Sequence, residues 1–105
     1  PFVPNAYLSF AEYFFEQGEM ENARQFYERV LAVQDENNQV YGYALYKMAW
    51  VLYNLQDFEG SLNKFYEVIE YGRAHPNAAS VTPLLRNARE VPFDDLAALE
   101  ARKGA

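Results

Sequence analysis

The sequence contains no cysteine and only one histidine, His75. Without cysteine the chain can form neither a disulfide nor a cysteine-ligated zinc site, and it has no thiolate nucleophile. His75 lies directly before Pro76 in a turn-like stretch, which is typical of an exposed loop residue rather than of a catalytic base or a metal ligand. These absences argue against metal binding and against most nucleophilic chemistry.

Positive charge is also scarce. Nine Lys and Arg residues stand against fifteen Asp and Glu residues, which gives a net charge of -6 at pH 7. Nucleic acids and anionic lipids both attract cations, so this balance disfavours either as a partner. No apolar run reaches the roughly 18 residues that a membrane helix needs, and the first residues lack the order of a signal peptide. We expect a soluble chain without membrane insertion, cytoplasmic or periplasmic, and the compartment stays open.

Motifs for catalysis or cofactor binding are missing as well. There is no glycine-rich phosphate loop and no serine in a tight strand-to-helix elbow. Acidic side chains are numerous, but pairs such as Glu67 and Glu70 have no neighbour that would separate their pKa values, as acid–base catalysis requires. We therefore predict that the chain is not an enzyme and that it has no cofactor, no metal site and no catalytic residue.

The sequence is rich in aromatic residues and in helical periodicity. Aromatic residues make up 17% of the 105 residues and half of the chain is apolar, enough for one folded core but not for two. Apolar residues recur at spacings of three and four through two long segments, which is the period of an amphipathic helix. The pattern is interrupted at Gly18 in the first segment and near Gln56 in the second. It predicts two antiparallel helical hairpins, separated by the turn-forming residues 35–38.

The two hairpins are related by an internal repeat. Superposing Gln56 on Gly18 defines a shift of 38 in residue number, which keeps the large and small core positions in the same places. A rival shift of 39 matches two Phe-Tyr-Glu triplets, at 26–28 and 65–67, but it moves the core residues off their helix faces. The shift of 38 is therefore preferred.

These residues resemble the tetratricopeptide repeat, a helical hairpin with small residues at close helix contacts, a turn glycine and an aromatic residue in its second helix. The positions that carry the resemblance are Tyr7, Phe10, Ala11, Phe14, Gly18, Ala23, Tyr27 and Val30 in the first repeat, and Leu45, Met48, Ala49, Leu52, Gln56, Ser61, Phe65 and Val68 in the second. Departures include alanine for glycine at Ala11 and Ala49, and Gln56 at the turn glycine. The family period is about 34 residues, so we expect the four extra residues to add a helical turn near 38–43.

The resemblance implies an all-α fold in which antiparallel hairpins stack into a short right-handed α-solenoid. We expect one domain over residues 1–105, with repeat one at about 4–37, repeat two at about 42–76, and a C-terminal cap or partial third repeat at about 78–105. The stretch 43–76 also resembles repeats of bacterial envelope and gliding-motility scaffold proteins.

The first helix of the second hairpin carries two apolar stripes where the core needs only one. The second stripe consists of Tyr43, Tyr46, Trp50 and Tyr53, and in the family this side of the helix lines a concave groove. The resemblance implies a protein-binding site made of Leu8, Glu12, Phe15, Glu16, Tyr43, Tyr46, Trp50, Tyr53 and Asn54. We predict a non-catalytic adaptor or assembly scaffold whose groove binds a peptide or helix of a partner protein.

The family's best-known peptide site holds a C-terminal carboxylate with Lys, Arg and Asn side chains. The corresponding positions here hold Leu8, Glu12, Tyr46 and Trp50. Binding of a chaperone tail of that kind is therefore disfavoured.

The aromatic stripe has two further interpretations. In one it is covered by a third unit or by a neighbouring repeat of a longer solenoid. In the other it meets a second copy of the chain, which gives a homo-oligomer. Four half-exposed aromatic rings would form a patch of the size that usually marks an interface, and the sequence does not identify the partner.

Overall fold

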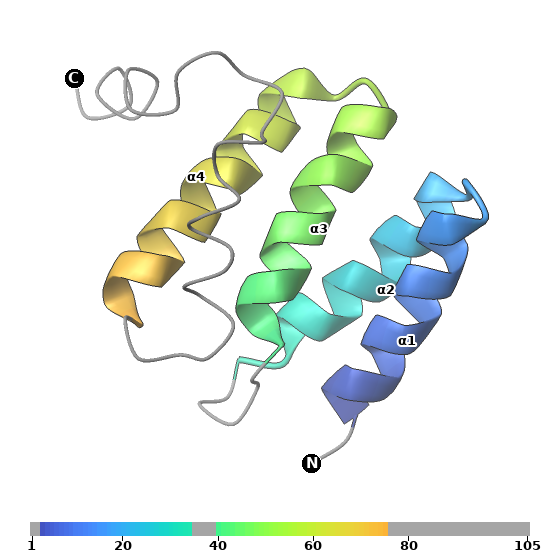
Figure 1. Cartoon of the computed structure of the whole chain (residues 1–105), viewed down its shortest axis with the longest axis horizontal. Coiled ribbons are helices and arrows are strands. Elements are labelled where there is room, and N and C mark those ends of the chain that lie inside the picture. The colour runs from blue at the N-terminus through green and yellow to red at the C-terminus, as the bar shows by residue number, and fades with distance from the viewer. Residues whose placement is uncertain (1–2, 35–39, 76–105) are drawn as a thin grey trace.

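The computed structural model describes residues 3–34 and 40–75. These residues form four helices and contain no strand; the helices are α1 (Val3–Glu16), α2 (Met20–Ala32), α3 (Tyr41–Asn54) and α4 (Phe58–Ala74). Short turns join α1 to α2 and α3 to α4 as antiparallel hairpins, and α2 packs on α3 (Figure 1). The expected all-α fold of two repeated hairpins is confirmed. The expected third unit, at about 78–105, lies outside the described residues.

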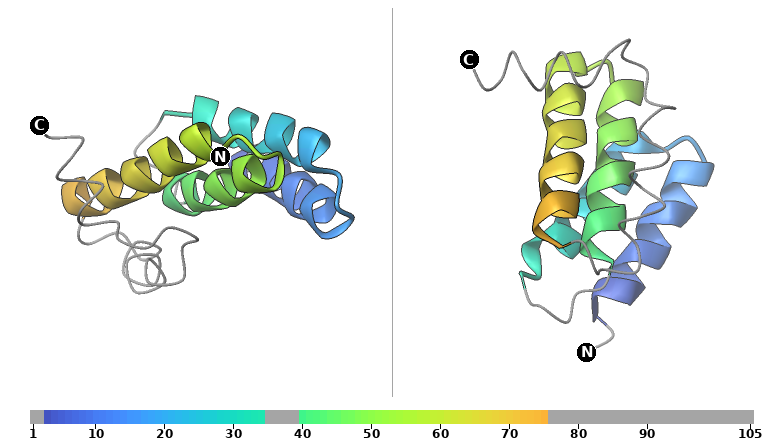
Figure 2. Two further views of the ribbon diagram at one scale, coloured as in Figure 1. Left: turned by 90° about the horizontal axis from the view of Figure 1, so that it is seen from above. Right: turned by 60° about the vertical axis from the view of Figure 1, so that its left-hand side comes forward.

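The first helices of the two hairpins face the same side of the molecule. In the left-hand view of Figure 2, α1 and α3 both lie below α2. Close backbone contact occurs between α1 and α2, between α2 and α3, and between α3 and α4. Contact between α1 and α3 therefore depends mainly on their side chains.

The main core lies where α1, α2 and α3 meet. Its buried residues are Ala11, Ala23, Tyr27, Val30, Ala44, Met48 and Val51. Ala11 and Ala23 are both fully buried, as expected for small residues that let two helices approach closely. A smaller cluster around Leu45 and Val68 joins α3 to α4.

Ser61 is the buried polar residue of the second hairpin. It takes the position that Ala23 has in the first hairpin, and it is fully buried. Its hydroxyl donates a hydrogen bond to the Ala49 carbonyl of α3 at 2.7 Å. A polar side chain is tolerated here because it is small and its donor is satisfied by the facing helix.

The turn of the first hairpin ends α1 with a left-handed residue. Gly18 has a φ of 79°. Its N–H donates to the Phe15 carbonyl at 3.1 Å, and the N–H of Glu19 donates to the Phe14 carbonyl at 2.9 Å. This pair of bonds is the Schellman motif, which satisfies carbonyls that a helix end leaves without partners.

The second hairpin uses the same turn with a different residue. Gln56 has a φ of 67°, and its N–H donates to the Tyr53 carbonyl at 3.0 Å. The N–H of Asp57 donates to the Leu52 carbonyl at 2.9 Å. Gln56 therefore does in the second hairpin what Gly18 does in the first, and the register that superposes these two residues is confirmed.

The four additional residues of the repeat do not lengthen α3. Helices α1 and α3 have the same length, 14 residues each. Helix α3 begins at Tyr41, with Val40 as its N-cap residue, so it does not extend back to residue 38. The expected helical turn near 38–43 is therefore wrong. The extra residues fall in the connection between Ala32 and Tyr41, of which residues 35–39 lie outside the described part.

Candidate protein-binding surface

A charged contact joins α1 and α3. The Lys47 ammonium of α3 lies 3.7 Å from the centre of the Phe15 ring of α1, which is a cation–π contact. Burial lowers the pKa of Lys47, while the carboxylates of Glu12 and Glu16 act in the opposite direction. The ammonium thus lies over a ring and is influenced by the charges of two acidic groups.

Tyr43 and Glu12 form a second link between these helices. The Tyr43 hydroxyl donates a hydrogen bond to the Glu12 carboxylate. Burial, this hydrogen bond and the nearby negative charges raise the pKa of Tyr43 to about 12. Tyr43 therefore stays neutral at physiological pH and remains a hydrogen-bond donor.

A buried tyrosine of α2 lies near the same charges. Tyr27 is fully buried, and its hydroxyl has no hydrogen-bond partner among the described residues. Burial raises its pKa far above the usual value, and the charges of Glu12 and Glu16 add to the effect. Tyr27 is thus a neutral core residue at any physiological pH.

The predicted aromatic stripe of α3 divides into two parts. Tyr43 reaches Glu12 of α1 and also packs against the cluster around Leu45 and Val68. Tyr46 and Trp50 contact Phe65 of α4. The ring centres of Tyr46 and Phe65 are 6.1 Å apart at 69°, and those of Trp50 and Phe65 are 5.6 Å apart at 88°. Both are edge-to-face contacts. Part of the stripe therefore contributes to packing within the second hairpin.

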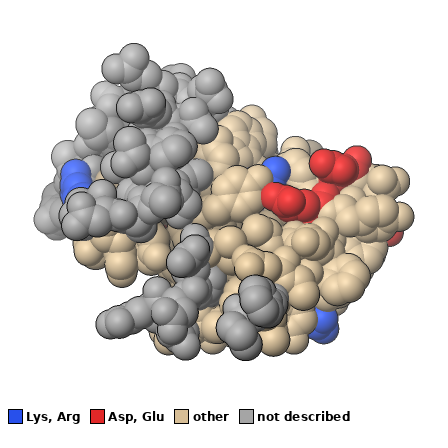
Figure 3. Space-filling model, turned by 60° about the horizontal axis from the view of Figure 1, so that its bottom comes forward, with Lys and Arg blue, Asp and Glu red and all other residues tan. Residues whose placement is uncertain are grey.

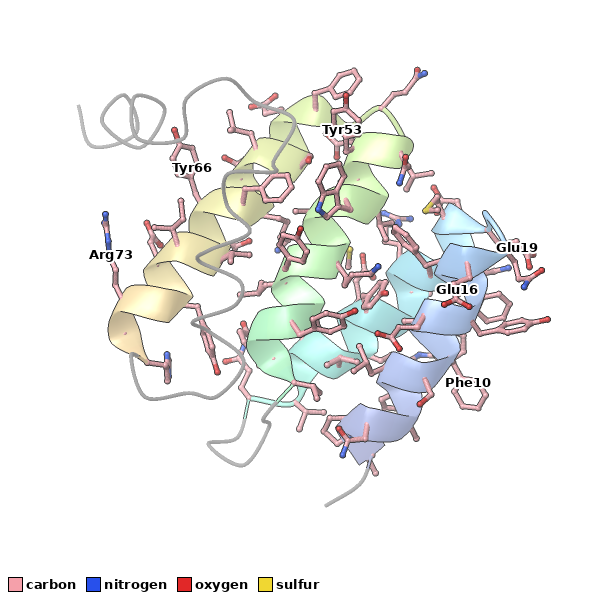
Figure 4. The ribbon with its side chains drawn as sticks, in the orientation of Figure 1. Phe10, Glu16, Glu19, Tyr53, Tyr66 and Arg73 are labelled. Carbon is pink, nitrogen blue, oxygen red and sulfur yellow. The ribbon has the colours of Figure 1, made fainter. Side chains whose placement is uncertain are left out.

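The edge-to-face contacts continue toward the α3–α4 turn. The Tyr53 ring lies 5.7 Å from Trp50 and 5.2 Å from Phe58, and Figure 4 shows Tyr53 at that end of the hairpin. Trp50 and Tyr53 are half-buried, and Phe58 is exposed. We call the set Tyr46, Trp50, Tyr53, Phe58 and Phe65 the aromatic cluster.

The other predicted site residues lie around these two groups. Leu8 and Phe15 are half-buried against the main core. Glu16 and Asn54 are exposed, and the Asn54 amide nitrogen lies 3.9 Å from the Met20 sulfur. The structure thus brings Glu12, Phe15, Glu16 and Tyr43 together and gathers Tyr46, Trp50 and Tyr53 beside α4.

Two residues of this surface were not predicted from the sequence. Lys47 lies four residues after Tyr43, a spacing that places both on one helix side, so the signal was present. Phe58 belongs to the first turn of α4, where nothing in the sequence marks it as a neighbour of Tyr53.

Acidic side chains gather beside a basic group on one face of the molecule in the space-filling view (Figure 3).

Metal-ligating clusters and membrane-spanning helices are both absent from the described residues. No group of three or more His, Asp and Glu side chains in 3–34 and 40–75 is placed to hold a metal ion. None of the four described helices is long and apolar enough to cross a membrane. A shallow depression of about 310 Å³ opens between the hairpins and is lined by Glu28, Leu31, Ala32, Met48, Leu52 and Lys64.

The comparisons with known proteins agree with the repeat seen in the structure. The family model of the tetratricopeptide repeat matches residues 5–33 and 43–71, two segments in the same register as the two turns. Comparison with curated proteins and with solved structures found no match, so the likeness to bacterial scaffold proteins stays a prediction. The family generally mediates protein–protein interaction or scaffolding and is generally non-catalytic. With more than half of its length matched and the same turn in both hairpins, the chain belongs to the tetratricopeptide repeat family.

Proposed function

We propose that this chain is a non-catalytic adaptor or scaffold module, which binds a peptide or helix of a partner protein across α1 and α3. The observation that carries the proposal is the row of half-buried aromatic rings, Tyr43, Tyr46, Trp50 and Tyr53, on α3. The core does not need all of them, because Met48, Val51 and Ala44 already fill the contact with the first hairpin. The rings therefore offer area to a partner.

The aromatic cluster suits a binding hot spot. Tryptophan and tyrosine combine a large apolar area with a polar tip, and they dominate binding energies at interface centres. Trp50 contacts both Phe65 and Tyr53 edge-on. A ring that is already held by its neighbours loses little conformational entropy when a partner covers it.

The α1 side of the surface favours a basic residue in the partner. Glu16 is exposed at this edge, as Figure 4 shows. The Glu12 carboxylate accepts a hydrogen bond from Tyr43, and the Lys47 ammonium lies over the Phe15 ring. With a net charge of -6, the chain attracts a cationic segment at long range. The preferred partner segment combines an apolar anchor for the aromatic cluster with a Lys or Arg for Glu16.

The experiment is affinity selection of peptides from a random library on the intact chain, followed by calorimetric titration of the selected peptide. Trp50→Ala should weaken binding about 30-fold, the effect of losing an aromatic hot spot of about 2 kcal/mol. Glu16→Lys should weaken binding by a smaller factor that shrinks at high salt. Tyr13→Ala is the matched control, because Tyr13 is an exposed aromatic residue of α1 that does not belong to the proposed site.

The results separate this proposal from its alternatives. Circular dichroism checks that each variant is folded, and Glu16→Lys remains informative if Trp50→Ala is not. Equal affinities for the parent chain and for both site variants would contradict the proposal. Light scattering that shows a dimer, with Trp50→Ala monomeric, would instead identify a second copy of the chain as the occupant.

A further inference from the structure

The first hairpin exposes apolar side chains on the side turned away from the second hairpin. Phe10 and Tyr13 of α1 are 54% and 57% exposed, and Figure 4 shows Phe10 pointing away from α3. The Phe26 ring of α2 lies 5.3 Å from Phe10 and 5.6 Å from Phe14. We call the set Val3, Tyr7, Phe10, Tyr13, Phe14 and Phe26 the outer aromatic face.

The positions equivalent to Phe10 and Tyr13, the two most exposed residues of this face, are buried in the second hairpin. In the register that superposes Gln56 on Gly18, Phe10 corresponds to Met48 and Tyr13 to Val51. Met48 is 2% exposed and Val51 is 0% exposed, because both belong to the core that α3 forms with the first hairpin. The outer aromatic face of α1 therefore corresponds to the side of α3 that packs against the first hairpin.

Helix α1 has the composition of an internal helix rather than of a cap. It contains no basic residue in its last turn and no acidic residue in its first, and it is as apolar as α3. The terminal helices of a repeat array normally present a polar outer face, which keeps the array soluble. An aromatic outer face instead indicates a surface that another element covers.

The edge of the outer aromatic face is positively charged. The Arg29 guanidinium of α2 lies 4.7 Å from the centre of the Phe26 ring and 5.8 Å from that of Tyr7. In the second hairpin, Lys64 has the position of Phe26, and it lines the same depression as Glu28 of the preceding helix α2. A docking helix of the α2 type would therefore place its counterpart of Glu28 near Phe26, over whose ring the Arg29 guanidinium lies.

We propose that the outer aromatic face docks the second helix of a further hairpin of the same repeat type, which packs on α1 as α2 packs on α3. The docked helix has apolar residues at the contact and an acidic residue near Arg29. Phe10 and Tyr13, the exposed centre of this face, lie roughly opposite Leu8 and Phe15 around α1, so the inference goes beyond the proposed partner groove and does not depend on it.

The proposal is tested by adding such a hairpin to the chain. A second copy of residues 3–40 is joined directly to Val3 of the full chain, which preserves the register of the repeat. Docking predicts a single cooperative thermal transition with Tm raised by roughly 5 °C or more, because a stacked repeat adds interface energy to its neighbour. Two separate transitions, one at the Tm of the parent chain, would overturn the proposal.

Substitutions at the junction make the result specific. Tyr13→Asp in the original α1 should leave the Tm of the parent chain nearly unchanged, because Tyr13 is exposed, and should abolish the gain in the extended chain. An extended chain with Phe10→Met and Tyr13→Val, the residues that α3 has at these positions, is the positive control. If only this control gains stability, the aromatic face does not fit a hairpin and the proposal fails.

The remaining alternative is that a second copy of the chain covers the outer aromatic face. Light scattering of the parent chain distinguishes it, since the proposal predicts a monomer at micromolar concentration. A dimer that Tyr13→Asp converts to a monomer would overturn the proposal in favour of self-association through this face. Neither outcome bears on peptide binding across α1 and α3, which is measured with Trp50→Ala and Glu16→Lys.

Discussion

Replacing Gln56 by glycine should stabilise the protein. Among the described residues Gln56 is the only non-glycine with a positive φ, 67°, and its side chain is exposed. The left-handed conformation costs an L-residue about 1–2 kcal/mol. Glycine avoids this cost but loses about 0.5–1 kcal/mol more conformational entropy on folding. The difference predicts that Gln56→Gly raises the free energy of unfolding by about 0.5–1 kcal/mol, or Tm by about 2–8 °C.

The reciprocal change tests the same reasoning with the opposite sign. Gly18 has a φ of 79°, and a Cβ added there would meet no atom within 4 Å. Gly18→Ala should therefore lower the free energy of unfolding by about 0.5–1 kcal/mol through the backbone alone. Urea denaturation followed by circular dichroism measures both variants. A loss of stability in Gln56→Gly would refute the reasoning, because it would mean that the glutamine side chain contributes more than its backbone strain removes.

Two further changes probe the core. Ala11→Leu should overpack the contact between α1 and α2 and lower the free energy of unfolding by about 1–3 kcal/mol in urea; an unchanged midpoint would contradict the close contact of these helices. Tyr27→Phe should raise the thermal midpoint, because it removes a buried hydroxyl that has no partner among the described residues. Burying such a hydroxyl costs about 1 kcal/mol of stability. A lowered midpoint would show that the hydroxyl is hydrogen-bonded in solution.

The repeat and its register could be predicted from the sequence. A helical hairpin with a short turn needs one left-handed residue at a fixed distance from the core positions. Gly18 indicates that place directly, and Gln56 is found by alignment although its residue type does not suggest it. Periodicity and small residues such as Ala11 and Ala49 specify the same alignment independently, so the fold class and the register follow.

The course of the inter-repeat connection could not be predicted in the same way. A period longer than the family's usual length of about 34 residues shows that something is inserted, but periodicity does not say whether a helix or a connection takes up the extra length. Helices α1 and α3 are equally long. The additional residues therefore lie between Ala32 and Tyr41, the last residue of α2 and the first of α3.

The division of the aromatic stripe was also beyond the sequence. Tyr43 and Trp50 are two helical turns apart and lie on nearly the same side of α3. Tyr43 nevertheless bonds to Glu12 of α1, while Trp50 packs on Phe65 of α4. Helical periodicity gives the direction in which a side chain leaves the helix axis. Which neighbouring helix the ring then contacts depends on tertiary packing.

The exposure of Phe10 has a similar cause. The spacing of apolar residues in α1 resembles that in α3, and both patterns predict a core position there. Met48 is buried at that position in α3, whereas Phe10 is 54% exposed in α1. A sequence pattern specifies which side of a helix is apolar, but burial requires a neighbouring hairpin, and α1 has one on its α3 side only among the described residues.

Acrylamide quenching of Trp50, with and without a selected partner peptide, shows whether the peptide covers the aromatic cluster. Trp50 is the only tryptophan in the chain, so tryptophan emission, excited selectively and with a peptide that contains no tryptophan, reports on the aromatic cluster. Because Trp50 is half-buried, we predict measurable quenching in the free chain and a marked decrease in quenching when the peptide saturates the protein. Quenching that is unchanged at saturation would mean that the peptide binds somewhere other than the aromatic cluster, contrary to the proposed function.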